Sequence, residues 1–213
     1  NLDRLLRLVL TCVTAGPGLG FNRAVLLLLN ESRTLIEGRL GVGPASADEA
    51  ARIWSELAQH PRSLGDHVLG LFDQSAAPAP GDAAMQHIAQ QIRVPLTEEH
   101  HLLVRAIHER RPLRVTDAAT DVRVPENLRR LLGARQFVCA PLVAHGNAVG
   151  AILADKVFSG QPISDEDVEM LQTFASHAGA AIAAAAAYRR LEQQLQELQE
   201  AEDRLLRSER LAT

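Results

Sequence analysis

The stretch LGARQFVCAPLVAHGNAVGAILADKVFSGQPISDEDVEMLQTFASHAGAAI, residues 132–182, decides the fold of this chain. It holds two apolar runs, 136–144 and 148–155, joined at His145-Gly146-Asn147, and this pattern predicts a β-hairpin. After the hairpin, Ser164-Asp165-Glu166-Asp167 is typical of a capping box, in which side chains bond the free amides of a helix's first turn. We therefore expect two antiparallel strands followed by a helix.

The predicted C-terminal helix has no strong breaker before the end of the chain. Gly179 is its one glycine, and an alanine-rich stretch leads into the polar segment LQELQEAEDRLLRSERLAT, residues 195–213. About 48 residues at 1.5 Å each give a helix roughly 70 Å long, which exceeds the size of the domain in which it starts. The second half of this helix is therefore expected to leave the domain.

Leucines recur along this second half at the spacing of a coiled coil. Four apolar positions lie seven residues apart: Leu191, Leu198, Leu205 and Ala212. Leu195 fills one core position between them, whereas Glu202 and Glu209 occupy the next two. The pattern predicts a weakly specified, parallel two-stranded coil. The alternative is a solvent-exposed helix with charge pairs four residues apart.

Upstream of residue 132, the pattern predicts a helix, a hairpin, a second helix, a loop, a strand, a third helix, an extended piece and a fourth helix. Ser46-Ala47-Asp48-Glu49 predicts the start of the second helix, and Thr97-Glu98-Glu99 that of the third. The loop includes SAAPAPGDAA, residues 75–84, expected to be a flexible surface insertion, and residues 65–72 can add a short helix. The expected helices cover 2–15, 47–59, 97–110 and 125–132; the expected strands cover 21–30, 34–41 and 91–96; the extended piece is 112–115.

Composition narrows the classes of partner. A net charge of -4 and a pI near 6.1 give no broad basic surface, so we expect no nucleic acid and no contact with anionic lipid. No apolar run reaches the roughly 18–20 residues that cross a bilayer.

The two cysteines, Cys12 and Cys139, are far apart, which argues against a redox or zinc motif and favours the reducing cytoplasm. The first residue is Asn1, so we expect a piece of a longer polypeptide.

The order of these elements resembles the GAF domain. The likeness is carried by FNRAVLLLLN and LIEGRLGVGP near the start, and by residues 132–182, which have that family's "PL…G..+G.L..D" hairpin and acidic-capped helix. The resemblance implies an α+β fold with a central antiparallel β-sheet flanked by α-helices, and a long C-terminal helix. It also implies a small-molecule pocket on one face and a homodimer formed through the first and last helices. The expected division is a sensor domain at 1–188 and a coiled-coil linker at 189–213.

The terminal segment RLLRSERLAT, residues 204–213, resembles the connector that leads into the kinase part of bacterial sensor histidine kinases. The resemblance implies a two-component signalling protein whose kinase part would pass a phosphoryl group to a response regulator. The sequence has no phosphoacceptor histidine motif and no ATP-binding domain, so we expect no enzyme activity in this chain. The alternatives are a structural dimerisation spacer without ligand, and a module that regulates a transcription factor or a cyclic-dinucleotide enzyme.

Five residues are candidates to line a ligand pocket: Arg93, His101, Arg105, Arg135 and Cys139. Arginines hold anions through paired hydrogen bonds, although a surface or core role remains open for each candidate. A buried, inert thiol is the expected state of Cys139. The cysteine and asparagine-lysine patterns of sulfoxide-reducing, bilin-binding and cyclic-nucleotide-binding relatives are missing, so the sequence names no cofactor.

A metal site is geometrically conceivable at Glu98, His101 and His108, whose spacing places them along one helix. No HxxxH pattern or cysteine completes such a set, so hydrogen-bonded or solvated histidines are expected and no metal is assigned. Asp117 and Asp121 are expected to stabilise turns in the loop between the extended piece and the fourth helix.

Overall fold

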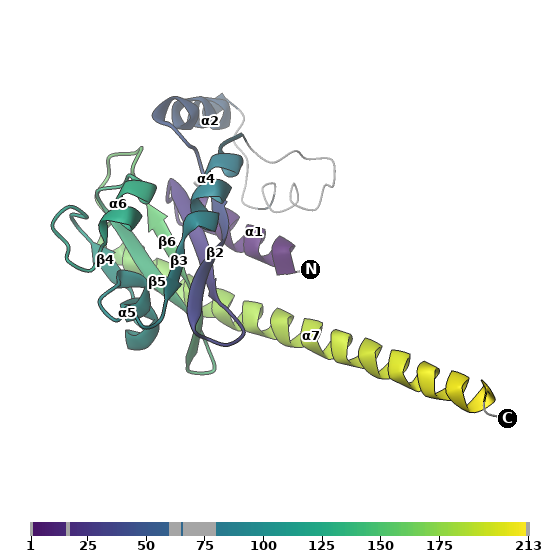
Figure 1. The fold of residues 1–213 in the computed structure, drawn as a ribbon. Helices are drawn as coiled ribbons and strands as arrows, with labels where there is room; N and C mark the ends of the chain where they lie inside the picture. The colour runs from purple at the N-terminus through teal and green to yellow at the C-terminus, as the bar shows by residue number, and fades with distance from the viewer. Residues whose placement is uncertain (1, 16–17, 60–64, 66–79, 212–213) are drawn as a thin grey trace.

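The computed structural model describes residues 2–15, 18–59, 65 and 80–211. Its β-strands are β1 (Arg23–Leu29), β2 (Leu35–Val42), β3 (Arg93–Pro95), β4 (Leu113–Val115), β5 (Phe137–Ala144) and β6 (Asn147–Asp155). Its helices are α1 (Leu2–Thr14), α2 (Ala47–Gln59), α4 (Pro80–Gln91), α5 (Leu102–Glu109), α6 (Glu126–Leu132) and α7 (Asp165–Leu211). The strands form one antiparallel sheet in the order β3-β2-β1-β6-β5-β4, which confirms the predicted α+β fold (Figure 1).

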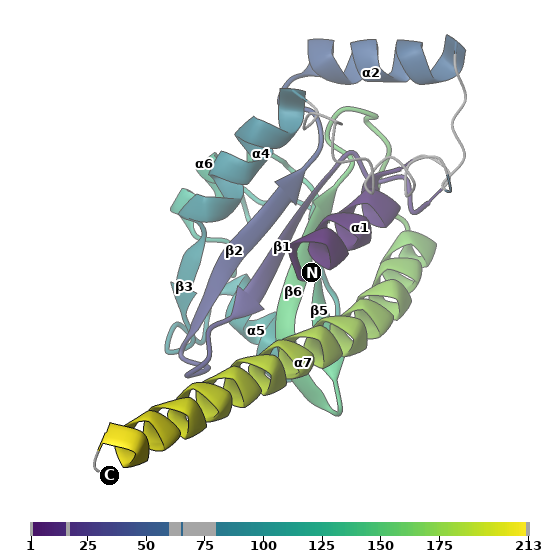
Figure 2. The same cartoon turned by 90° about the vertical axis from the view of Figure 1, so that its right-hand side faces the viewer.

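The two faces of the sheet carry separate hydrophobic cores because successive side chains of a strand point to opposite faces. In β1, Val25 and Leu27 pack with side chains of α4, α5 and α6, whereas Ala24 and Leu26 pack with those of α1 and α7. Figure 2 shows α1 and α7 crossing the same face of the sheet. Helices α4, α5 and α6 therefore lie on one face, and α1 and α7 on the other.

The hairpin and the capping boxes predicted from sequence are confirmed. The strands β5 and β6 pair from Val138 with Ala154 to Ala144 with Asn147, and the turn at His145 and Gly146 has φ values of 50° and 76°. At the start of α7, the amide of Asp167 donates to Ser164 Oγ (3.1 Å) and the amide of Ser164 donates to Asp167 Oδ2 (2.8 Å). At α2, Glu49 bonds both Ser46 Oγ and the amide of Ala45.

Helix α4 is a correction to the sequence prediction. Part of the expected flexible insertion, residues 80–84, belongs to this helix, and so does Gln91, which was assigned to a strand. Helix α4 lies directly on β2, where a Cβ atom added to Gly38 or Gly41 would meet its backbone at Ala89 or Met85. The rest of the insertion, 75–79, and all of the short helix proposed at 65–72 except Gly65 lie outside the described residues.

The start of α5 is also corrected. The helix was expected from Thr97, but residues 97–100 form turns and His101 is the N-cap, with its Nδ1 atom accepting a hydrogen bond from the amide of Leu103 (3.2 Å). The turns are held by backbone bonds from Glu98 to Pro95 and from His101 to Glu98. A smaller correction concerns Pro125, which is the N-cap of α6 instead of its first helical residue.

Helix α7 is continuous for 47 residues, as the sequence predicted. Its first half packs on β5, where a Cβ atom added to Gly179 would lie 2.7 Å from the backbone nitrogen of Val143. Its second half projects away from the sheet (Figure 1). None of the helices in the described part of the chain combines the length and the apolar character that a membrane crossing requires.

Candidate functional site

The face of the sheet that carries α4, α5 and α6 is filled by side chains. The void found there, between Met85 of α4, Leu132 of α6 and the strands, measures about 10 Å³. That volume is near the lower limit for one water molecule. This cavity therefore offers no room for a ligand of several atoms.

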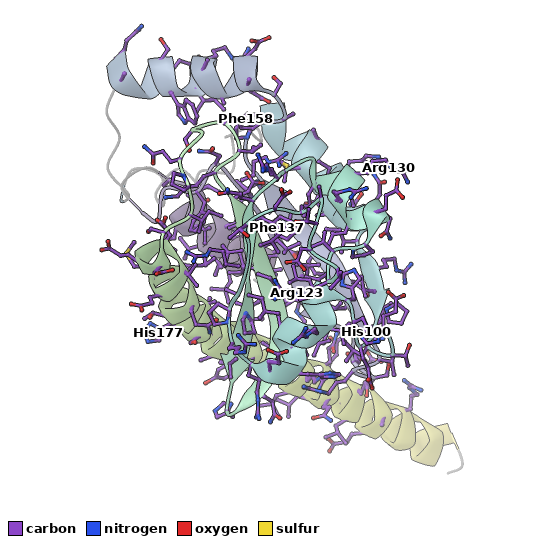
Figure 3. All side chains as sticks on the ribbon, turned by 90° about the vertical axis from the view of Figure 1, so that its left-hand side faces the viewer. His100, Arg123, Arg130, Phe137, Phe158 and His177 are labelled. Atoms are coloured by element: carbon purple, nitrogen blue, oxygen red, sulfur yellow. The ribbon has the colours of Figure 1, made fainter. Side chains whose placement is uncertain are left out.

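A larger hollow of about 410 Å³ opens where two loops meet at the start of α5. It is lined by residues 97–101 from the loop before α5 and by Val122, Arg123 and Pro125 from the loop before α6. The amide of Leu102 donates to the carbonyl of Arg123 (2.8 Å) and ties the two loops together. Figure 3 shows His100 and Arg123 at the α5 end of the molecule and Phe158 toward the opposite end.

His101 is the most buried polar side chain that lines this hollow, with 5% of its surface exposed. Its Nδ1 atom caps α5, so a neutral ring carries its proton on Nε2. Burial lowers the pKa of His101 to about 4, because desolvation disfavours the imidazolium ion. The side chain is therefore a neutral hydrogen-bond donor at physiological pH.

Arg123 forms the other fixed part of the hollow. Its Nε and Nη2 atoms donate to the two carboxylate oxygens of Asp121 at 2.9 and 2.6 Å, which is the bidentate geometry of a strong ion pair. This hydrogen bonding raises the pKa of Arg123 and lowers that of Asp121. On α5, the charge of Arg105 also lowers the pKa of Asp121, and the charge of Glu109 also raises the pKa of Arg123.

The five candidate residues do not gather at one place in the described structure. His101 lines the hollow, and Arg105 lies one turn later on α5, paired with Glu109 (2.7 Å). Arg93 pairs with Glu37 across β3 and β2 (2.8 Å), and Arg135 pairs with Asp117 (3.0 Å) on the surface.

Cys139 lies in the middle of β5, fully buried, and desolvation raises its pKa to about 12. The thiol is therefore inert, as the sequence predicted. The predicted turns are confirmed, since Asp117 and Asp121 accept bonds from the amides of Ala119 and Arg123. In the described part of the chain, no three His, Cys, Asp or Glu side chains group closely enough to hold a metal ion.

A buried ion pair at the other end of the sheet was missed from the sequence. The Arg23 guanidinium donates to Asp155 from Nε (3.0 Å) and from Nη2 (2.7 Å), and it also donates to the carbonyl of Leu132 at the end of α6 (2.7 Å). Both side chains are less than a tenth exposed. Burial raises the pKa of Asp155, and the charge of Arg23 opposes that rise. The sequence signal was a charged residue at the end of each of two apolar strands.

This ion pair lies next to the capping box of α7. Lys156, the residue after Asp155, donates to Asp167 Oδ1 (2.8 Å), and both side chains are 11% exposed. Asn22, the residue before Arg23, accepts from the amides of Phe158 and Ser159 (2.8 Å each). The end of α6, the ends of β1 and β6 and the start of α7 are thus joined by one polar network.

An antiparallel sheet with α4, α5 and α6 on one face and the two terminal helices on the other defines an α+β domain of three layers. The family model for the GAF domain matches residues 2–182, which is most of the chain. The chain belongs to the GAF family. No curated protein shows a significant match to the sequence.

Solved structures agree on the fold. A methyl-accepting chemotaxis protein, residues 122 to 287, is 22% identical, with a TM-score of 0.57 over 86% of this chain and 89% of that one. A domain assigned to a two-component sensor histidine kinase protein from Sinorhizobium meliloti 1021 is 15% identical, with a TM-score of 0.53 over 88% of this chain and 96% of that one. The GAF domain of a phosphoenolpyruvate-protein phosphotransferase from Coxiella burnetii is 14% identical, with a TM-score of 0.51 over 89% of this chain and 99% of that one.

Proposed function

We propose that this chain is the regulatory module of a two-component sensor histidine kinase, and that it dimerises through α1 and α7 and relays its state along α7. One observation carries the proposal: α7 is a wall of the domain core over its first half and a free helix over its second. Leu171 and Ala175 are fully buried against the sheet, whereas Leu191 and Leu198 are 53% and 66% exposed. A change in the domain can therefore reach the far end of α7 without crossing a break in the helix.

The exposed side of α7 supports the dimer. Two series of positions seven residues apart run along it: Met170, His177, Ala184, Leu191 and Leu198, and Phe174, Ala181, Tyr188 and Leu195. All of these side chains except the half-buried Phe174 are exposed. We call this nine-residue set the α7 seam. Because it begins within the domain and continues along the projecting half, a second copy of the chain would cover it with its own α7.

Two further observations support the kinase context. The segment 204–213 resembles the connector of sensor histidine kinases, and one solved structure with the same fold is assigned to such a protein. In this context the partner of the kinase part is a response regulator, and the two free cysteines suit a cytoplasmic location. Other proteins with this fold serve chemotaxis and phosphotransfer, so a different output domain is the competing reading.

A structural spacer is a second candidate function, favoured by one specific observation. The cavity lined by Met85 of α4, Leu132 of α6 and the strands measures only about 10 Å³. A spacer needs the dimer and the helix but no ligand. The two candidates therefore differ in ligand binding and agree on the dimer.

The dimer is tested by light scattering during size-exclusion chromatography. The intact chain is expected to elute with the mass of two copies. The double variant Leu191→Glu with Leu198→Glu is expected to elute with the mass of one copy, because like charges would face each other in the seam. The pair Gln193→Glu and Gln196→Glu adds the same charge away from the seam and should remain dimeric. A monomeric intact chain, or a control as disrupted as the seam variant, overturns the proposal.

The kinase context is tested in the polypeptide that carries this domain at its natural length. ATP-dependent phosphorylation of a histidine, altered by the Leu191→Glu and Leu198→Glu pair, is the expected result. Phosphorylation that does not respond to the pair would favour the spacer. A polypeptide that incorporates no phosphate on histidine would favour a different output domain.

A further inference from the structure

The hollow between the two loops presents a fixed donor on one side. His101 uses Nδ1 to cap α5, so the proton on Nε2 lies on the opposite edge of the ring. Nothing else in the described ranges partners that N–H, and the residue is 95% buried while lining the hollow. The buried side-chain atoms that lack a partner in the described residues do not include Nε2, so this N–H is reached by solvent and can donate to the acceptor of a ligand.

Arg123 adds a second donor with a full positive charge. Its Nε and Nη2 atoms are committed to Asp121, and Nη2 also reaches the carbonyl of Arg114 (3.4 Å). Among the described groups, none partners its Nη1 atom, which therefore keeps two N–H donors. The ion pair with Asp121 fixes the guanidinium plane, and the side chain is 23% exposed. A carboxylate between His101 and Arg123 would accept from both.

The remaining charged groups of the hollow have the opposite sign. Glu98 and Glu99 line it from the loop before α5, and both are exposed. No ion pair within the described residues involves either carboxylate. They can accept hydrogen bonds from an ammonium group. A volume of about 410 Å³ falls within the range of small-molecule sites.

We propose that this hollow binds a zwitterionic small molecule of the α-amino acid class, with its carboxylate at His101 and Arg123 and its ammonium group at Glu98 and Glu99. Each half of such a ligand meets groups of complementary charge or hydrogen-bonding capacity. An anion alone would face two carboxylates, and a cation alone would face Arg123. The regulatory meaning of the site rests on the function proposed above, since binding would hold together the loops before α5 and α6.

The test is a titration followed by ¹H–¹⁵N correlation spectra of the labelled chain. The probes are glycine, L-alanine, L-serine and L-leucine, each added separately, with propionate and ethylamine as analogues that lack the ammonium or the carboxylate group. At least one amino acid is expected to cause saturable shifts in amides of residues 97–103 and 121–125. Both analogues are expected to bind at least about tenfold more weakly, since each loses a charged hydrogen-bonding group.

Variants separate the two halves of the site. His101→Ser retains a capping oxygen but loses the Nε2 donor, and Glu98→Gln with Glu99→Gln removes both carboxylates without touching the core. Each of these two variants is expected to bind the amino acid about tenfold more weakly than the original chain does. Glu192→Gln with Glu197→Gln removes the same charge from the projecting helix and should leave the affinity unchanged.

Three results would overturn the assignment: no saturable shift with any of the four amino acids, propionate binding as tightly as L-alanine, or shifts confined to residues away from the two loops. Light scattering on the same samples keeps this outcome separate from that of the proposed function. Binding by a monomeric chain would support the site and reject the dimer, and a dimer without binding would do the reverse.

Discussion

The two halves of α7 show that leucine content does not decide what a helix buries. The half that packs on the sheet is rich in alanine, and Ala175, Ala178 and Ile182 are at most 5% exposed there. The projecting half carries the leucines, and Leu191, Leu195 and Leu198 are all more than half exposed. Small side chains let the helix approach β5 closely, whereas the leucines have no surface to cover in a single chain. Burial therefore follows from the surface that is available to each half.

The largest expected contrast is between two leucines of the same helix. Leu171→Ala should cost about 2–5 kcal/mol of unfolding free energy, because it leaves a cavity in the core between α7 and the sheet. At concentrations low enough to keep the chain monomeric, Leu198→Ala should cost less than about 0.5 kcal/mol, since the side chain is 66% exposed in the single chain. Denaturant unfolding followed by circular dichroism measures both. Equal losses would mean that the projecting half is part of the domain's cooperative core.

A smaller contrast concerns Gly179, where the backbone of α7 lies close to that of β5. Gly179→Ala should cost about 1–3 kcal/mol, because the new Cβ would lie 2.7–2.9 Å from backbone atoms of Leu142 and Val143. A glycine-to-alanine substitution at an exposed helical position would instead raise the free energy of unfolding by about 1 kcal/mol. Ala180→Gly, at an exposed neighbouring position, is the matched control and should lose about 1 kcal/mol. A stabilising Gly179→Ala would show that α7 can shift away from the strand at little cost.

The start of α7 should show a moderate, pH-dependent effect. Burial alone would raise the pKa of Asp167, but bonds from Lys156 and Ser164 hold it below its ordinary value. The bonds therefore stabilise the fold above the unfolded pKa of about 3.9, and this contribution is lost as pH falls through the folded pKa.

Asp167→Asn should cost about 1 kcal/mol at neutral pH and progressively less below about pH 4. Thermal unfolding across this pH range measures the difference between the variant and the original chain. Glu166→Gln, in the same helical turn, should change stability by only a few tenths of a kcal/mol. A difference between Asp167→Asn and the original chain that does not depend on pH would contradict the assigned pKa direction.

The smallest effect is expected at the charge pairs of the projecting half. Glu200 accepts from Arg204 (3.4 Å) and Gln196 (3.3 Å), and its side chain is 55% exposed. Glu200→Gln should therefore cost at most about 0.5 kcal/mol, and high salt should reduce even that. Helical content measured by circular dichroism at low and high salt tests this. A large, salt-independent loss would place Glu200 in a buried contact.

Sequence reasoning succeeded where the signal is local. The hairpin at His145 and Gly146, the capping boxes at Ser46 and Ser164, and the length of α7 each depend on residues close together in the chain. It failed at α4, whose alanine, proline and glycine content is typical of a loop. That helix forms because it can lie on β2, and the signal was the pair Gly38 and Gly41 within a strand, which marks a close backbone approach.

The candidate site was only partly predictable for a similar reason. His101 was among the five pocket candidates, but its bond from the amide of Leu103 and its place beside the loop that contains Arg123 depend on where α5 begins. Arg23 and Asp155 are 132 residues apart, and only the pairing of β1 with β6 brings them together. Contacts of this kind follow from the order of strands, which no local pattern specifies.

The close approach at Gly179 has a mechanical consequence for the rest of α7. If the helix pivots where its backbone touches β5, the remaining 32 residues to Leu211 form a lever arm of roughly 48 Å. A tilt of about 5° at the pivot would then displace the far end by about 4 Å, roughly three quarters of the rise of one helical turn. In the proposed relay, the length of this arm would set how far a small tilt within the domain moves the far end of α7.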